Sequence, residues 1–359
     1  MQFVEQLSTT PTTPERRAEI LAAPGFGKFF TDHMVTAVWT KADGWGDAVV
    51  QPYGPIQISP AAAVLHYAQE IFEGLKAYRH PDGSIWSFRP EANGERLNRS
   101  AARLALPALP VEDFLGSIDA LVRADAAWVP GGEEEQSLYL RPFMFASEAF
   151  LGVRPAAEVT YSLIACPVGA YFHGGIKPVD LWLSTTYTRA ARGGTGAAKC
   201  GGNYAASLAA MIEAGEHGCD QVCFLDAVEG RWVEELGGMN IYFVHRDGRL
   251  VTPEVSGTIL EGVTRSSILT LAKEQGLHVE ERRVDIDEWR RGVESGDITE
   301  VFACGTAAVI TPVGTLKWDG GQVGSGEGER EVTFALRKAL VDIQYGRAED
   351  RHGWLRRLL

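Results

Sequence analysis

The segment A-A-K-C-G-G-N-Y, residues 197–204, places Lys199 in a glycine-rich loop directly before an apolar helical pattern. A lysine beside glycines is most often a solvated loop residue, so Lys199 alone decides nothing. Three other segments carry groups that could each bind part of one cofactor. They are W-V-E-E-L-G-G-M-N at 232–240, I-L-E-G-V-T-R at 259–265 and C-G-T-A-A at 304–308. Because these three segments accompany it, Lys199 becomes a candidate for binding a cofactor.

Pyridoxal 5'-phosphate is a cofactor whose chemical needs these segments could meet. It requires a lysine amine to form a Schiff base with its aldehyde, an anion beside its ring nitrogen and a cup for its phosphate. A lysine with a pKa near ~10.4 is mostly protonated at neutral pH, so the site must favour the neutral amine by desolvation and neighbouring cations. Lys199 is the candidate amine. Glu235 is the candidate anion, because a carboxylate there keeps the ring nitrogen protonated and the ring electron-withdrawing.

The phosphate cup is expected at the start of the helix that opens at Thr264. Backbone N–H groups of Val263 and Thr264, the threonine hydroxyl and the positive end of the helix dipole all favour an anion there. Standing alone, Thr264 would be an ordinary N-cap. Thr306 and Ala307 lie in a tight turn at the end of an expected strand, where two N–H groups and a hydroxyl could point into a cleft. The alternative is a simple turn.

Composition and charge limit the kinds of partner. The chain has 359 residues, 45% of them hydrophobic and 23% charged, which is typical of a globular protein and long enough for two domains. The formal net charge of -13 disfavours binding to nucleic acid or to an anionic membrane. Five scattered cysteines without C-x-x-C spacing predict reduced thiols and no metal site. The N-terminus lacks signal-peptide features, so we expect a soluble, cytoplasmic protein.

Strand and helix patterns are mixed along the chain and predict an α/β (α+β mixed) fold of two domains. We expect a smaller N-terminal domain over 1–172, with a flexible arm at 1–25, an interdomain loop at 173–180, and a larger C-terminal domain over 181–359 that carries the lysine. The pattern predicts helices over 93–106, 111–129, 204–215, 264–275, 286–293 and 332–344. It predicts strands over 30–39, 56–59, 74–78, 84–88, 137–145, 159–168, 179–186, 221–226, 241–244, 249–252, 278–284 and 301–310.

At these residues the chain resembles the branched-chain amino acid aminotransferases, which are pyridoxal-phosphate enzymes of fold type IV with the active site between two domains. The resemblance covers nearly the whole chain after residue 25. Its motifs are F-G-K-F-F-T-D-H-M at 26–34, H-Y-A-Q-E-I-F-E-G-L-K-A-Y at 66–78, F-R-P-E-A-N at 88–93, S-L-Y-L-R-P at 137–142, C-P-V-G-A-Y-F at 166–172, D-I-Q-Y-G at 342–346 and the segments around Lys199, Glu235 and Thr264.

The resemblance implies roles for individual residues in binding the cofactor and the substrate's α-carboxylate. Lys199 is the catalytic residue, which forms the Schiff base and then moves the proton between the substrate and the cofactor. The other implied cofactor-binding residues are Tyr204 at the phenolic oxygen, Glu235 at the ring nitrogen, Arg189 in a supporting role, and Arg96, Val263, Thr264 and Thr306 at the phosphate. The backbone of Thr306 and Ala307 binds the α-carboxylate, and Tyr67 reaches it from the neighbouring subunit.

The resemblance also implies a substrate pocket that accepts both a branched aliphatic side chain and that of glutamate. Its apolar wall is formed by Phe30, Phe72, Tyr139 and Tyr171, with Val153 contributed by the partner chain. Arg141 meets the distal carboxylate of glutamate and can point toward water when a methyl group arrives. Without the motifs, the aromatic residues would be interpreted as ordinary core.

The implied activity is the reversible transfer of an amino group between L-leucine, L-isoleucine or L-valine and 2-oxoglutarate. It proceeds by a ping-pong cycle through pyridoxamine phosphate in a homodimer with shared active sites. Two alternatives stay open. One is another fold type IV enzyme, a D-amino acid aminotransferase or an aminodeoxychorismate lyase, and the other is a catalytically idle member that only binds the cofactor. Two departures are Gly238, where some relatives have threonine, and residues 308–311, which lack a redox-active C-x-x-C.

Overall fold

The structure is a computed structural model that describes residues 1–132, 135–169, 176–324 and 329–359. Its chain forms two compact units. Unit 1 comprises Met1–Tyr171, Ala198–Gly201 and Asp342–Leu359, and unit 2 comprises Phe172–Ala197 and Gly202–Val341. Each unit contains a mixed sheet with helices, so the predicted mixed α/β fold class is confirmed. Within the described ranges, no helix combines the length and the hydrophobicity that a membrane span requires.

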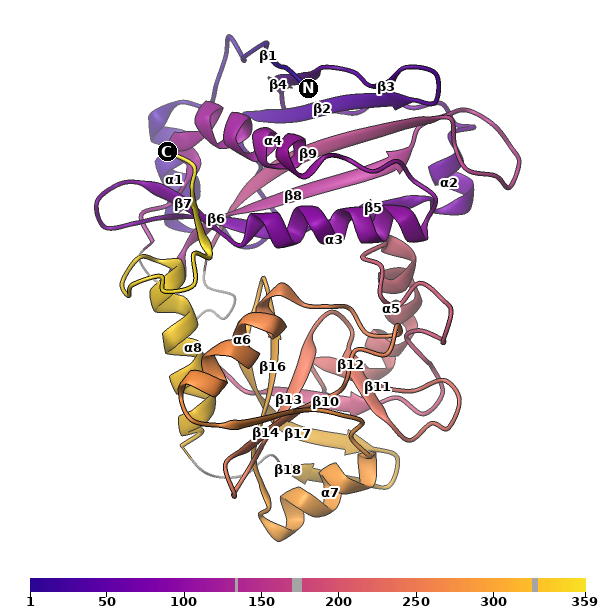
Figure 1. Ribbon diagram of the computed structural model, residues 1–359, viewed down its shortest axis with the longest axis vertical. Helices are drawn as coiled ribbons and strands as arrows, with labels where there is room; N and C mark the ends of the chain where they lie inside the picture. Colours follow the sequence, from indigo (N-terminus) through magenta and orange to yellow (C-terminus); the bar gives the residue numbers. More distant parts are fainter. Residues whose placement is uncertain (133–134, 170–175, 325–328) are drawn as a thin grey trace. The chain divides into compact units, whose positions relative to one another are not determined.

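Unit 1 is built on a ten-stranded sheet in the order β1-β4-β2-β9-β8-β6-β7-β19, with β3 beside β2 and β5 beside β8. Helices α3 and α4 lie along this sheet (Figure 1). The elements are β1 (Phe3–Glu5), α1 (Pro14–Ala22), β2 (His33–Thr40), β3 (Gly44–Trp45), β4 (Ala48–Pro52), α2 (Ala63–Tyr67), β5 (Glu70–Phe72), β6 (Leu75–Arg79), β7 (Ile85–Phe88), α3 (Pro90–Arg103), α4 (Val111–Ala124), a 3-10 turn (Ala126–Trp128), β8 (Ser137–Ala146), β9 (Glu158–Val168) and β19 (Leu355–Arg357).

The buried face of α3 carries polar side chains as well as apolar ones. Leu97 and Ala101 are fully buried at helical spacing in the core of unit 1. Asn93, Arg96 and Ser100 recur at the same three- and four-residue spacing and are also buried. Residues at this spacing share one helix face. The helix therefore directs an arginine, an amide and a hydroxyl inward with its apolar side chains.

Unit 2 is built on a nine-stranded sheet in the order β12-β11-β10-β17-β16-β13-β14-β15, with β18 beside β17. Strand β10 is parallel to both of its neighbours, whereas β16 is antiparallel to β13 and to β17. The elements are β10 (Val179–Leu183), α5 (Gly201–Glu216), β11 (Gln221–Leu225), β12 (Val233–Leu236), β13 (Asn240–His245), β14 (Arg249–Thr252), α6 (Val263–Glu274), β15 (His278–Glu281), α7 (Ile286–Ser295), β16 (Ile298–Gly305), β17 (Val309–Trp318), β18 (Gly321–Gly324) and α8 (Glu331–Gln344).

Residues 1–25, expected to form a flexible arm, contain a strand and a helix instead. Strand β1 pairs in parallel with β4, and the N-terminal ammonium of Met1 forms an ion pair with Asp113 at 2.6 Å. Helix α1 is capped by the hydroxyl of Thr13, which accepts from the backbone N–H of Arg16. The polar composition concealed this order because few apolar side chains hold the segment: Phe3 and Leu21 pack against the unit 1 core, and strand pairing and the cap add to this. Only Ile20 of α1 is buried.

The units differ from the predicted domain limits in two places. Residues 198–201 and 342–359 belong to unit 1, although the sequence analysis assigned both to the C-terminal domain. Strand β19 explains the second difference because it pairs antiparallel with β7 of unit 1. Residues 173–175 of the expected interdomain loop lie outside the described residues, and β10 already begins at Val179. The domain limits stay a proposal at this loop.

Candidate active site

The backbone of Lys199 is fixed to unit 1 by hydrogen bonds on both sides. The N–H of Phe72 donates to the Lys199 carbonyl at 2.9 Å, and the N–H of Lys199 donates to Ser100 Oγ at 2.9 Å. The next helix, α5, starts with the N–H of Gly201 donating to the Glu70 carboxylate. The neighbouring side chains Ala198 and Cys200 are buried in the unit 1 core. The lysine is therefore held between β5 and α3.

The side chain of Lys199 lies among residues predicted for the substrate pocket. Its Nζ is 4.8 Å from the ring centre of Phe72. The guanidinium of Arg141 lies 4.7 Å from the same ring and 5.3 Å from that of Tyr139. Arg141 Nη2 also donates to the Tyr139 hydroxyl at 3.0 Å, and Phe30 packs against the apolar cluster that contains Tyr139. Unit 1 thus brings an amine, three aromatic rings and an arginine together.

The charges around Lys199 favour its neutral amine. Burial and the nearby cation Arg96 lower the pKa of Lys199 to about 8, from an ordinary value of 10.5. Arg141 acts in the same direction, whereas Glu73 and Tyr139 oppose the shift. At this pKa roughly one amine in ten is neutral at pH 7, compared with fewer than one in a thousand for an ordinary lysine. The environment therefore supplies the perturbed amine that the sequence analysis required.

Gly74 makes room for the Tyr139 ring. A Cβ atom added to Gly74 would overlap the Tyr139 hydroxyl and lie 2.9 Å from Cζ of that ring. Any side chain at this position would therefore displace Tyr139, and with it the hydroxyl that accepts from Arg141. Packing against Tyr139 therefore explains why the F-E-G motif has glycine at this position, which the sequence pattern did not reveal.

Glu235 on β12 forms a buried ion pair within unit 2. Its Oε1 lies 2.6 Å from Arg189 Nη1, and both side chains are 2% exposed. Oε1 also accepts from the N–H of Leu260 at 3.0 Å. Arg189 Nη1 donates in addition to the carbonyl of Thr258 at 2.9 Å. These contacts hold the carboxylate in one orientation, and the supporting role of Arg189 stays a prediction.

Asn240 connects Glu235 with the start of α6. Its Nδ2 donates to the Leu260 carbonyl at 3.1 Å and lies 3.5 Å from Glu235 Oε2. A Cβ atom at Gly262 would overlap Asn240 Oδ1, so the N-cap position of α6 closely approaches this amide. No side chain caps α6 at Gly262. The predicted phosphate residues Val263 and Thr264 therefore begin a helix beside the Glu235 group.

The turn that carries Thr306 and Ala307 lies next to the same group. Strands β13 and β16 pair Asn240 with Cys304, so the residues after Cys304 continue beside those before Asn240. A Cβ atom at Gly238 would be 3.4 Å from Tyr204 Cε1. A threonine there would contact the tyrosine directly, whereas the glycine of this chain leaves that space open.

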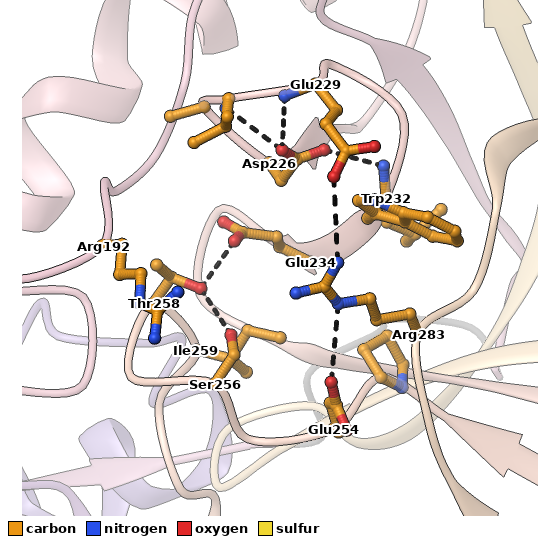
Figure 2. Close-up of a pocket in the computed structure, with 14 residues that line it drawn as sticks. Arg192, Asp226, Glu229, Trp232, Glu234, Glu254, Ser256, Thr258, Ile259 and Arg283 are labelled. Atoms are coloured by element: carbon orange, nitrogen blue, oxygen red, sulfur yellow. Dashed lines mark hydrogen bonds and ion pairs between the residues drawn. The ribbon is translucent and has the colours of Figure 1, made fainter.

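A cavity of about 400 Å³ in unit 2 lies beside this network but contains none of the predicted site residues in its lining. Glu234 and Thr258 line it, and Figure 2 shows the Thr258 hydroxyl donating to Glu234. Glu234 and Glu235 are adjacent on β12, so their side chains point to opposite faces of the strand. The cavity is therefore separate from the Glu235 carboxylate. Thr258 lines the cavity and accepts from Arg189 with its carbonyl.

The predicted residues accordingly fall into groups within each unit. The group in unit 1 consists of Phe30, Phe72, Arg96, Tyr139, Arg141 and Lys199. The group in unit 2 consists of Arg189, Tyr204, Glu235, Val263, Thr264, Thr306 and Ala307. Tyr67 and Val153 lie outside the unit 1 group and are 39% and 90% exposed. Tyr171 lies outside the described residues. The sequence analysis gave no role to Glu73 and Asn240, which lie in quoted motifs, or to Ser100, which lies in the expected helix 93–106.

Comparison with known proteins shows the family to which the chain belongs. The family described as amino-transferase class IV matches residues 70–316. A probable branched-chain-amino-acid aminotransferase of Streptomyces coelicolor is 58% identical over 98% of this chain and 97% of its own length. The chain belongs to the class IV aminotransferases, among the branched-chain-amino-acid aminotransferases. The suspected family is thereby confirmed, and the protein is a transaminase.

Solved structures give the same result for the fold of the enzyme. The branched-chain amino acid aminotransferase of Escherichia coli matches with a TM-score of 0.74 at 29% identity, over 90% of this chain and 99% of that chain. The T.th. enzyme with pyridoxamine 5'-phosphate matches with a TM-score of 0.73 at 30% identity, over 90% and 98%. A second structure of the T.th. enzyme, complexed with N-(5'-phosphopyridoxyl)-L-glutamate, matches with a TM-score of 0.70 at 29% identity over the same shares. The predicted fold type IV is confirmed.

Proposed function

We propose that this enzyme reversibly transfers an amino group between L-leucine, L-isoleucine or L-valine and 2-oxoglutarate, in a ping-pong cycle with pyridoxal 5'-phosphate. The observation that carries the proposal is the 58% identity to a branched-chain-amino-acid aminotransferase over nearly the whole chain. The two T.th. structures support the cofactor and glutamate as amino donor, since their ligands are the amine form of the cofactor and a cofactor–glutamate conjugate.

The donor set fits pyridoxal 5'-phosphate. Lys199 supplies an amine of lowered pKa, and Glu235 supplies a fixed carboxylate for the ring nitrogen. Tyr204, Arg96, Val263, Thr264 and Thr306 are the proposed residues for the phenolic oxygen and the phosphate. When bound, the cofactor supplies an aldehyde and an electron-withdrawing ring that stabilises the charge left when the substrate loses its α proton. The chain's own residues then have separate tasks.

Lys199 is the proposed base and acid of the reaction. Its Nζ accepts the α proton as a neutral amine and returns a proton as an ammonium, and a pKa of about 8 makes both forms accessible near neutral pH. Arg189 keeps the Glu235 carboxylate oriented through the ion pair at 2.6 Å. The backbone hydrogen bonds to Phe72 and Ser100 fix the base of the lysine, so only its side chain has to move.

The two kinds of substrate are accommodated by one arginine among aromatic rings. Phe72 and Tyr139 offer an apolar surface for a branched side chain. Arg141 lies over both rings, and its buried Nε has no hydrogen-bond partner within the described residues. An arginine with an unused donor can bind the distal carboxylate of glutamate through charge-assisted hydrogen bonds.

A homodimer and a cytoplasmic location are part of the proposal. Tyr67 and Val153, which are proposed to reach the partner's site, lie on two segments joined by an isolated bridge between Ala62 and Ala149. Leu65 and Leu151 on the same segments are 57% and 72% exposed. Exposed apolar side chains gathered on adjoining segments support an interface with a second copy. The net charge of -13 supports a location away from anionic membranes.

Half-reactions with single amino donors test the proposed activity. We expect L-leucine, L-isoleucine, L-valine and L-glutamate each to convert the bound cofactor to its amine form, and D-alanine to leave it unchanged. The measurement is the visible absorbance of the purified enzyme after each addition. A response to D-alanine alone would favour the D-amino acid aminotransferases, and no response to any donor would favour a catalytically idle protein.

Replacing Arg141 should separate the two half-reactions. In Arg141→Gln we expect kcat/KM for glutamate to fall about 10- to 100-fold, as for the loss of a hydrogen bond to a charged group, and kcat/KM for leucine to fall less than about threefold. Stopped-flow measurement of each half-reaction gives both values. Arg290→Gln, which removes a half-buried arginine paired with Asp287 on α7, is the matched control. Equal losses with both donors would contradict the role of Arg141.

A further inference from the structure

Glu73 is a buried carboxylate to which the sequence analysis gave no role. It follows β5 directly, and its N–H donates to the Pro142 carbonyl at 2.7 Å. The residue is 0% exposed. Such a group is tolerated in a protein core only when its charge is paired and its oxygens accept hydrogen bonds.

The partner of Glu73 is Arg96, and the pairing is bidentate. Arg96 Nε donates to Oε1 and Nη2 donates to Oε2, each at 2.8 Å. Asn93 Nδ2 also donates to Oε2 at 2.7 Å. Two parallel bonds fix the plane of a guanidinium as well as its position. Glu73 therefore determines which way Arg96 faces.

The pair stands next to the reactive lysine. Lys199 is faced by Arg96 from α3, by Tyr139 and Arg141 from β8, by the Phe72 ring and by Glu73 itself. Burial alone would raise the pKa of Glu73, but Arg96 and Lys199 hold it below its usual value, so the carboxylate is ionised at neutral pH. It is the counter-charge for Arg96 and for the Lys199 amine.

We propose that Glu73 is a positioning residue of the transamination site: its carboxylate orients Arg96 and offsets the positive charge that Arg96 brings beside Lys199. The inference rests on the proposed roles of Lys199 and Arg96 with the cofactor. Arg96 can then bind the cofactor phosphate without suppressing the ammonium form of Lys199. Lys199 needs its ammonium form to return the proton. Neither task involves contact between Glu73 and the substrate.

The test is a titration of the Lys199 amine in the full-length protein without cofactor. Its rate of reaction with trinitrobenzenesulfonate is followed from pH 6 to pH 11 by mass spectrometry of the Lys199 peptide. The native midpoint is expected near pH 8, where the pKa of Lys199 lies. Removing the carboxylate raises the free energy of the charged form of Lys199, because a nearby negative charge is lost. In Glu73→Gln we therefore expect the midpoint to fall by roughly one pH unit. The dissociation constant of pyridoxal 5'-phosphate should rise about tenfold as Arg96 loses its orientation.

Two further variants keep the test decisive. Glu73→Asp retains the charge on a shorter side chain, so its midpoint should stay near the native one while cofactor binding weakens. Glu300→Gln removes another buried carboxylate, which accepts from Val332 and Thr333 in unit 2, and should move neither value. A lower melting temperature of Glu73→Gln with midpoint and affinity equal to those of Glu300→Gln would overturn the proposal and leave Glu73 a merely structural residue.

A separate measurement distinguishes this inference from the proposed function. Borohydride reduction of the cofactor-loaded native protein should attach the cofactor to Lys199. If the attachment is found but the Glu73→Gln midpoint is unmoved, only the role of Glu73 is refuted. If the cofactor is attached elsewhere or not at all, the proposed function itself is refuted.

Discussion

Lys199→Ala should lower transamination about 10⁴-fold, the upper end of what a positioned acid–base group contributes, because the chain then lacks its proposed base. The variant should also lose the covalent link to pyridoxal 5'-phosphate. Turnover of leucine with 2-oxoglutarate measures the first effect. The mass of the peptide containing residue 199 after borohydride reduction measures the second.

The control for this variant is Lys317→Ala. Lys317 lies on β17 and contacts the carbonyls of His217 and Gly218 rather than the site residues. Its removal should leave turnover within about twofold, the cofactor attached at residue 199 and the melting temperature nearly unchanged. If Lys199→Ala kept native turnover, the assignment of the amine would be wrong.

Glu235→Gln should affect both stability and turnover. Arg189 would keep its charge at 2% exposure with its carboxylate partner gone, so we expect the free energy of unfolding to fall by about 3 kcal/mol. Turnover should fall about 100-fold, as for other fixed groups that stabilise developing charge. Urea denaturation and steady-state kinetics measure the two effects.

Two companion variants separate the ion pair from the chemistry. In the double variant Arg189→Gln with Glu235→Gln, both charges are absent, so much of the stability should return while turnover stays low. Glu234→Gln changes the adjacent buried carboxyl, which faces the 400 Å³ cavity and can still accept from Thr258, and should cost less than about threefold in turnover. A similar loss in Glu234→Gln would show that Glu235 has no special role.

Local patterns predicted helices well and strands less well. The apolar spacing of 93–106 and 111–129 predicted α3 and α4, because each helix buries one continuous stripe against the sheet. The expected strand 56–59 is absent, and the expected strand 301–310 covers the end of β16, a turn and the start of β17. That turn leads into Val309 with a φ of 59°, a conformation rare for a β-branched residue, so no turn signal marked it.

The sequence by itself determined which residues are candidates for chemistry, because Lys199, Glu235, Thr264 and Arg141 stand in motifs whose residue types are needed for this cofactor. The tertiary structure decided what surrounds them. A residue's neighbours in space come from strands and helices that are far away in the chain. Examples are the hydrogen bond between the backbones of Phe72 and Lys199 and the bidentate ion pair between Glu73 and Arg96. Desolvation and charge act through those distances, so the lowered pKa of Lys199 followed only from the folded chain.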